Sequence, residues 1–204
     1  MAFAPVPPNT ADTVTVPDGF TSDVLIRWGD PVTSRAPRFD VRQQTAESAA
    51  EQFGYNCDYV GVLPLSKNRS LLVVNHEYTN EELMFPTGLY DTAAMKRIAI
   101  ESHGMAVVEI QPQGKNGSWR QRSARSARYN RRITGTTPFL LEGAAAGDAR
   151  LRTSADPSGR RALGTFNNCA GGITPWGTVL SGEENFNQYF QASGSTPPEY
   201  AASY

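Results

Sequence analysis

Short apolar runs separated by turn residues dominate the pattern along the chain. The run "DVLIRWGD" predicts a strand over residues 23–30 that ends at a Gly-Asp turn. The runs "YVGVLPL" (59–65) and "SLLVVNHEY" (70–78) flank the polar turn "SKNR" (66–69), which predicts a β-hairpin. The same kind of pattern predicts further strands at residues 105–111, near 163–167 and near 177–182.

Only one segment has the pattern of a helix. Residues 91–103, "DTAAMKRIAIESH", carry a partly amphipathic face, with Asp91 placed to cap the N-terminus and Gly104 placed to end the helix. The sequence therefore predicts an all-β-dominated fold with one short inserted helix.

The remaining segments divide the chain into a core region and two edges. Its 204 residues suffice for one medium domain, which we place at 23–190. Four prolines mark residues 1–22 as an extended N-terminal edge, and 191–204 form an irregular or truncated C-terminal tail. Residues 142–161 are rich in Ala, Gly and charge and predict a loop.

Composition and charge exclude few functions, but they bear on which partners and cellular locations to expect. The formal net charge of −1 gives no reason to expect a nucleic-acid or anionic-membrane partner. No apolar run is long enough for a transmembrane helix, and the first residues lack the pattern of a signal peptide. Residues 115–135 are locally basic, which fits a solvated strand and loop or an anion-facing surface. The residues concerned are Lys115, Arg120, Arg122, Arg125, Arg128, Arg131 and Arg132, with Asn130 among them.

Two stretches of the chain resemble one another. Residues 55–80 and 166–187 each begin with an aromatic residue and an Asn-Cys pair, pass a turn, and end an apolar strand in a glutamate. Aligning the strand ends matches Glu77 with Glu184 and His76 with Glu183, and it puts Cys57 and Cys169 at the same place. A chance similarity is the alternative. A true repeat, as in radial β architectures, would bring Glu77 and Glu184 together.

The motif "SGEEN" places Glu183 and Glu184 at a predicted strand end beside Asn185. Carboxylate and amide oxygens suit hard cations such as calcium, provided that the backbone turns there. The plain alternative is an exposed acidic turn.

The two histidines have different contexts. His76, in "VNHEY", fits a metal ligand or a packed polar residue equally well. His103 lies at the predicted helix end, where a cation or cap is expected. No zinc motif is present in the sequence.

The motif "NNCAGG" gives Cys169 an unusual neighbourhood. Its two glycines permit a close backbone approach or a positive φ. A buried inert thiol, a thiolate metal ligand and a nucleophile are all compatible with it. A single disulfide between Cys57 and Cys169 is also possible.

These motifs lie within longer stretches that resemble the PhoX family of bacterial alkaline phosphatases. The stretches are "EQFGYNCDYVGVLPL", "LLVVNHEYTNEELMFP", "ARYNRRITGTTPF", "TSADPSGRRALGTFNNCAGGITPWGT" and "GEENFNQYF". They follow the family's order and extend over about residues 5–190, which is far more specific than any single motif.

The resemblance implies a β-propeller, here incomplete, with a central cluster of iron and calcium. It implies hydrolysis of phosphate monoesters by a protein that is monomeric at full length, in the periplasm or secreted after twin-arginine export. It makes Cys169 an iron ligand and assigns metal binding to Glu77 and Glu184, with Glu183 less firmly placed. The catalytic residues are not assigned, and Cys57 receives no role.

Family members are roughly three times longer than this chain, and further carboxylate and arginine site residues come from their remaining part. We therefore expect the isolated 204 residues to be poorly active or inactive. Two other functions stay open: a non-catalytic propeller segment that binds calcium or another ligand through Glu77 and Glu184, and a propeller hydrolase acting on lactones or other esters.

Overall fold

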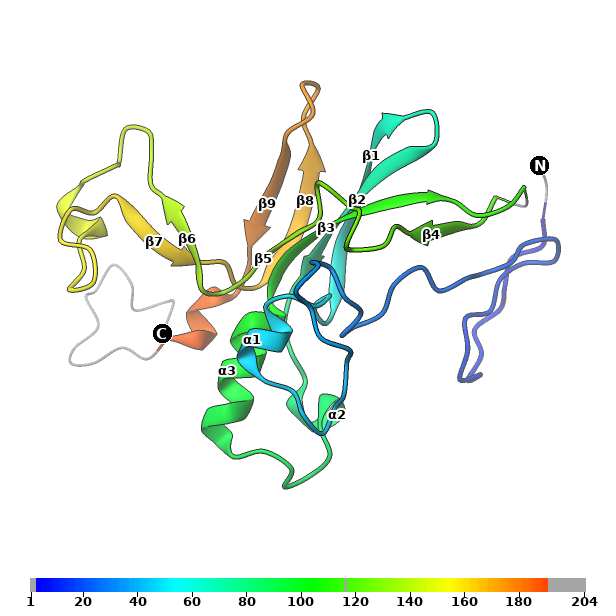
Figure 1. The fold of residues 1–204 in the computed structure, drawn as a ribbon, viewed down its shortest axis with the longest axis horizontal. Helices are drawn as coiled ribbons and strands as arrows, with labels where there is room; N and C mark the ends of the chain where they lie inside the picture. Colours follow the sequence, from blue (N-terminus) through cyan, green and yellow to red (C-terminus); the bar gives the residue numbers. More distant parts are fainter. Residues whose placement is uncertain (1–2, 116, 191–204) are drawn as a thin grey trace.

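The computed structural model describes residues 3–115 and 117–190, and more of these residues lie in strands than in helices (Figure 1). The α-helices are few and short, so the expected β-dominated fold is confirmed at this level. Besides the expected helix, two single-turn helices occur, α1 (Ala46–Ala49) and α2 (Glu81–Met84).

A five-stranded sheet forms the centre of the described structure. The hairpin of β1 (Cys57–Ser66) and β2 (Arg69–His76) confirms the two predicted strands and their turn. On its other side, β2 pairs antiparallel with β3 (Gly104–Pro112). Two short strands pair in succession with the free edge of β3: β4 (Trp119–Gln121) near its end and β5 (Arg131–Ile133) near its start.

The predicted helix is α3, Thr92–Ser102. Asp91 is its N-cap, and its carboxylate accepts a hydrogen bond from Ala94 N–H at 2.7 Å. Ile98 is buried in a cluster between the helices and the loop around Trp28. The three α-helices therefore gather together below the strands in the view of Figure 1.

The main core lies on one face of the central sheet. Alternate residues of β2 and β3 point into it because successive strand residues face opposite sides. Its buried members are Val32, Phe53, Leu72, Val74, Ala106, Val108 and Ile110. The other face of β2 is also buried, at Val73 and Asn75, so this strand is covered on both sides.

The prediction of a strand at residues 23–30 is wrong. This segment is irregular, and Asp30 closes a turn by accepting the Arg27 N–H at 2.7 Å. Leu25 and Ile26 nevertheless pack against the main core. The apolar residues of this run are there because they are partly buried against the core. No neighbouring strand pairs with the run along its length.

Two further hairpins follow the central sheet. The first joins β6 (Thr137–Leu140) to β7 (Arg161–Gly164), and the second joins β8 (Asn168–Ile173) to β9 (Val179–Glu183). The strands β7 and β9 were predicted with bounds shifted by a few residues. The strand β8 was not, because its glycines suggested a turn.

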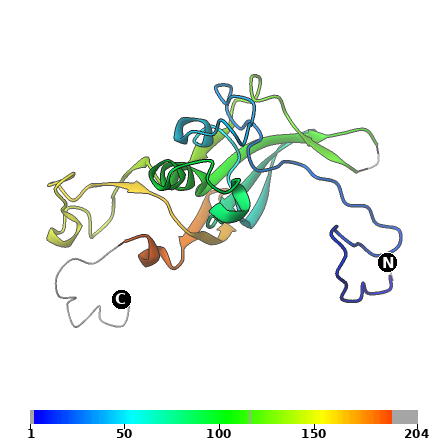
Figure 2. The ribbon, with the colours of Figure 1, turned by 90° about the horizontal axis from the view of Figure 1, so that it is seen from below.

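The β6–β7 hairpin and the N-terminal segment lie at opposite ends of the molecule (Figure 2). Residues 3–22, expected as an extended edge, contain no helix or strand. Residues 142–161, expected as a loop, contain only the short helix η1 (Ala149–Leu151) and the first residue of β7. The predicted tail at 191–204 lies outside the described residues. Within the described part of the chain, no helix has the length and apolar character needed to span a membrane.

Candidate metal centre

The hairpins β1–β2 and β8–β9 begin and end in the same way. Asn56 and Asn167 immediately precede the first strands, and both adopt positive φ, 44° and 46°. The carbonyl oxygen of Asn56 accepts the N–H of Glu77 at 2.9 Å, and that of Asn167 accepts the N–H of Glu184 at 2.9 Å. The two glutamates that end the sequence repeat therefore leave their strands through identical backbone contacts.

Both hairpins also contain a register shift at the same place. In β1 it lies between Cys57 and Val60, and in β8 it lies between Asn168 and Gly171. Each shift inserts one extra residue directly after the first strand pair. Such a bulge re-aims the side chains at that point.

The structure corrects the alignment of the two cysteines. Counted from the paired asparagines, Cys169 corresponds to Asp58, one residue beyond Cys57. Both thiols are free, so the possible disulfide between Cys57 and Cys169 is not formed.

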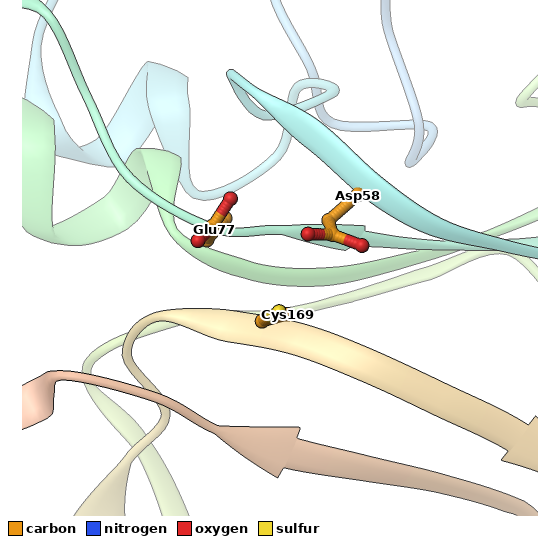
Figure 3. Close-up of side chains that lie close together, drawn as sticks. All are labelled: Asp58, Glu77 and Cys169. Atoms are coloured by element: carbon orange, nitrogen blue, oxygen red, sulfur yellow. The ribbon is translucent and has the colours of Figure 1, made fainter.

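The equivalent residues converge on one location. Asp58, Glu77 and Cys169 each offer a ligand atom, and these atoms all lie within 4.8 Å of one another. Figure 3 shows Asp58 on β1 and Glu77 just after β2, with Cys169 facing them from β8. Residues far apart in the sequence thus form one group of two carboxylates and a thiol.

The sequence motifs did not single out Asp58. The signal was present in the repeat, because "NCD" and "NNC" align on their first asparagines once the bulge is counted. Without the register, the match of the two cysteines was the more obvious choice.

Glu184 adjoins this group through Cys169. Hydrogen bonding of the thiol to Glu184 and then to Asp58 raises the pKa of Cys169 to about 12. The thiol therefore keeps its proton at neutral pH beside these carboxylates. A bound cation would reverse this balance, because metals are held by the thiolate form.

Glu77 responds to the same crowding of negative groups. Its pKa is raised, first by burial and then by the charges of Asp58 and Glu184. Like charges held together in this way favour a cation between them. The donor set fits metal ions of two kinds, since carboxylates suit hard cations and a thiolate suits transition metals.

Glu183 is engaged elsewhere. Its Oε1 accepts hydrogen bonds from the Thr165 hydroxyl and from the Phe166 N–H, the latter at 2.9 Å. Neighbouring strand residues face opposite sides, so Glu183 points away when Glu184 points toward Cys169. The structure thus brings Cys169, Glu77 and Glu184 together and does not bring Glu183 into their group.

A close contact sets the distance between the hairpins. A Cβ at Gly171 would lie 2.5 Å from Cγ of Tyr59, so the Tyr59 ring occupies the space that a side chain would fill. The first glycine of "NNCAGG" is thereby explained, because it allows β8 to approach β1 closely.

The chain matches the family model described as alkaline phosphatase PhoX over residues 1–202. It belongs to the PhoX family. No curated protein matches the chain.

A solved PhoX structure supports the same assignment. The chain is similar to Pseudomonas fluorescens PhoX in complex with vanadate, a transition state analogue, with 41% sequence identity and a TM-score of 0.87. The match covers 98% of this chain and 35% of that chain. The chain therefore spans about a third of the length of this PhoX relative.

In this PhoX family member, His76 is a packed polar residue. It is fully buried, its Nε2 accepts the Gly54 N–H at 3.3 Å, and its ring meets Phe53 edge-on at 4.6 Å. Burial, followed by the charges of Arg132 and His103, lowers its pKa well below the usual value. Of the two interpretations of His76, the structure favours packing.

His103 is the C-cap residue of α3, as expected, but it is not a cation. Its Nδ1 contacts the Ala99 carbonyl oxygen at 2.6 Å, and burial is the main cause that lowers its pKa. The helix end therefore carries a neutral imidazole, because the interior disfavours the charged form.

The basic region is partly structural. Arg132 donates hydrogen bonds to the carbonyl oxygens of Met105, Glu101 and His103, and burial lowers its pKa to about 10. Arg122 lies 3.2 Å from the fully buried carboxylate of Glu109. Only the other basic residues of the region, such as Arg125 and Arg131, are exposed.

Proposed function

We propose that the chain forms part of a metal-dependent phosphatase that hydrolyses phosphate monoesters with a cluster of iron and calcium. The observation that carries this proposal is the group of Asp58, Glu77 and Cys169, in a chain of the PhoX family. The vanadate bound to the P. fluorescens relative adds support, since vanadate there is a transition state analogue. The corresponding substrate is a phosphate monoester.

Each hairpin would supply one pair of ligands. Cys169 and Glu184 would hold iron, and Asp58 and Glu77 would complete the site on the calcium side. Cations bound there would neutralise phosphate oxygens and the charge that develops on the leaving oxygen. We assign Glu183 an orienting role in place of a ligand role, because its hydrogen bonds hold the backbone before Asn167.

The chain's own residues prepare this site in three ways. The bulges aim Asp58 and Cys169 at each other, and the asparagine contacts fix the backbone of Glu77 and Glu184. Third, the thiol of Cys169 lies beside the carboxylates and would give up its proton if a cation were bound there.

The finer architecture belongs to the same proposal. Two-stranded hairpins such as β6–β7 and β8–β9 are marginal on their own and leave open edges. In a full-length protein they would be parts of blades of a β-propeller, with Glu77 and Glu184 directed to its centre. By family analogy such a protein would act in the periplasm or outside the cell, as a monomer.

A chimaera tests the activity. Residues 1–190 of this chain would replace the matching part of P. fluorescens PhoX, and the product would be assayed with a chromogenic phosphate monoester in the presence of calcium and iron. We expect hydrolysis by the chimaera and little or none by the 204 residues alone. Cys169→Ser in the chimaera should lose iron and turnover, whereas Cys57→Ser, at an exposed thiol, should keep both.

Three results would contradict the proposal. A folded chimaera that holds calcium without iron or hydrolysis would indicate a binding segment. Preference for a lactone over the phosphate ester would indicate a different hydrolase. Unchanged iron content and turnover in Cys169→Ser would mean that the Cys169 thiolate is not a ligand of the site.

A further inference from the structure

A buried amide connects the two hairpins at Cys169. Asn75 on β2 is fully buried, and its Nδ2 donates to the carbonyl oxygens of Cys169 at 2.9 Å and Ala170 at 3.2 Å. The hydroxyl of Ser181 donates to Asn75 Oδ1 at 3.1 Å and accepts from Asn168 Nδ2 at 2.9 Å. The bulge that carries Cys169 is thus tied to the central sheet from both of its own strands.

A second contact lies just beyond Glu184. His103 uses Nδ1–H for the Ala99 carbonyl, so its Nε2 accepts the hydroxyl proton of Tyr189 at 2.8 Å. The ring of Tyr189 stacks on Phe166 with centroids 5.2 Å apart and an interplanar angle of 13°. Tyr189 follows the hairpin and Phe166 precedes it, so both ends are held against the end of α3.

The surroundings of Tyr189 keep its hydroxyl protonated. Burial, and then the charges of Glu81 and Glu77, raise its pKa to about 12. The phenol therefore keeps its proton at neutral pH and can donate it in the hydrogen bond to His103. The influence of Glu77 also places the phenol within electrostatic reach of the candidate metal centre.

We propose that Asn75 and the Tyr189–His103 pair are positioning residues for the metal centre. Asn75 fixes the direction of Cys169 through its backbone carbonyl, and the pair fixes Glu184 through the segment that follows it. The inference rests on the proposed function and adds residues that contact no substrate and hold no metal. Because the two contacts act on different ligands, their loss has different consequences.

The test uses the 204-residue chain in a Cys57→Ser background, which leaves Cys169 as its only thiol. Cobalt(II) is the probe, because its thiolate complex absorbs by charge transfer and so reports on Cys169. Two measurements need no metal: the rate at which an alkylating reagent modifies Cys169, and hydrogen exchange at the amide of Glu184.

We expect Asn75→Leu to weaken the cobalt–thiolate band and to speed alkylation at least about threefold, because the bulge that carries Cys169 loses its contacts to β2 and opens more often. Ser181→Ala should act in the same direction more weakly. Tyr189→Phe keeps the stacking but loses the hydroxyl. It should keep the band, lower cobalt affinity about tenfold and speed exchange at Glu184. The controls are Asn68→Ala in the β1–β2 turn and Tyr129→Phe, and both should match the parent chain.

The outcomes separate this inference from the proposed function. A parent chain without a cobalt–thiolate band argues against Cys169 as a ligand, and the two metal-free measurements then decide the positioning roles alone. Unchanged alkylation in both Asn75→Leu and Ser181→Ala overturns the role of Asn75. Unchanged hydrogen exchange at the Glu184 amide in Tyr189→Phe overturns the role of Tyr189. Equal losses of the cobalt–thiolate band in Asn75→Leu and Tyr189→Phe overturn the conclusion that the two contacts act on different ligands. If Asn75→Leu fails to fold, Ser181→Ala carries the comparison.

Discussion

Asp58 and Cys169 occupy equivalent positions in two hairpins that share a preceding left-handed asparagine, a bulge and a closing glutamate. The equivalence makes the candidate centre an internal near-duplicate in which one carboxylate is replaced by a thiol. The two hairpins thus present different ligand atoms, an oxygen and a sulfur, from the same backbone arrangement. Metal preference should therefore follow the side chain at this single position.

Cys169→Ser should lower the affinity for a thiophilic ion at least about 100-fold, because a serine hydroxyl does not replace a thiolate ligand. Cobalt(II) titration of the 204-residue chain measures this directly. Cys57→Ser is the matched control, and an equal loss in both variants would point to general damage instead.

Asp58→Asn should lower calcium affinity about tenfold, because it removes a negative oxygen ligand while keeping shape. Calcium binding is measured by titration calorimetry. Glu82→Gln, at an exposed site on α2, serves as the control. Calcium affinity that is the same in Asp58→Asn and the parent chain would exclude Asp58 from the site.

Mild acid should destabilise the chain through its two buried histidines. Burial lowers the pKa of both His76 and His103 in the folded state, so the unfolded chain binds more protons below about pH 6.5. Stability is therefore present above that pH and is lost as the pH falls, by up to about 1.4 kcal/mol per pH unit for each histidine. Urea denaturation between pH 7 and pH 5.5 gives the slope, and His103→Gln should flatten it; a slope unaffected by this change would contradict the assignment.

Gly104→Ala should destabilise the fold strongly. The residue has φ +89°, and a Cβ there would lie 2.1 Å from the Ile133 carbonyl oxygen. Gly88→Ala is the control, because it has φ +73° with nothing within 4 Å. The backbone strain of about 1 to 2 kcal/mol is common to both, so any excess in Gly104→Ala measures the clash. Equal free energies of unfolding would mean that β5 can move away.

The local elements were readable from the sequence where pattern and turn chemistry agreed. The β1–β2 hairpin follows from two apolar runs around "SKNR", and α3 follows from Asp91 and Gly104 at its ends. The segment at 23–30 misled because burial of Leu25 and Ile26 needs no strand partner. The strand β8 was missed because its glycines, which signal a turn locally, serve a close approach to Tyr59.

The sequence by itself determined the family and the β-rich class, and its repeat predicted that Glu77 and Glu184 converge, since these depend on order and spacing along the chain. Only the tertiary structure decided that Asp58 joins Cys169 and that Glu183 turns away. A bulge of one residue reverses which side chains face the centre, and its position depends on strand register. The direction of Cys169 also depends on contacts between residues distant in the sequence, such as those of Asn75, so no local pattern contains it.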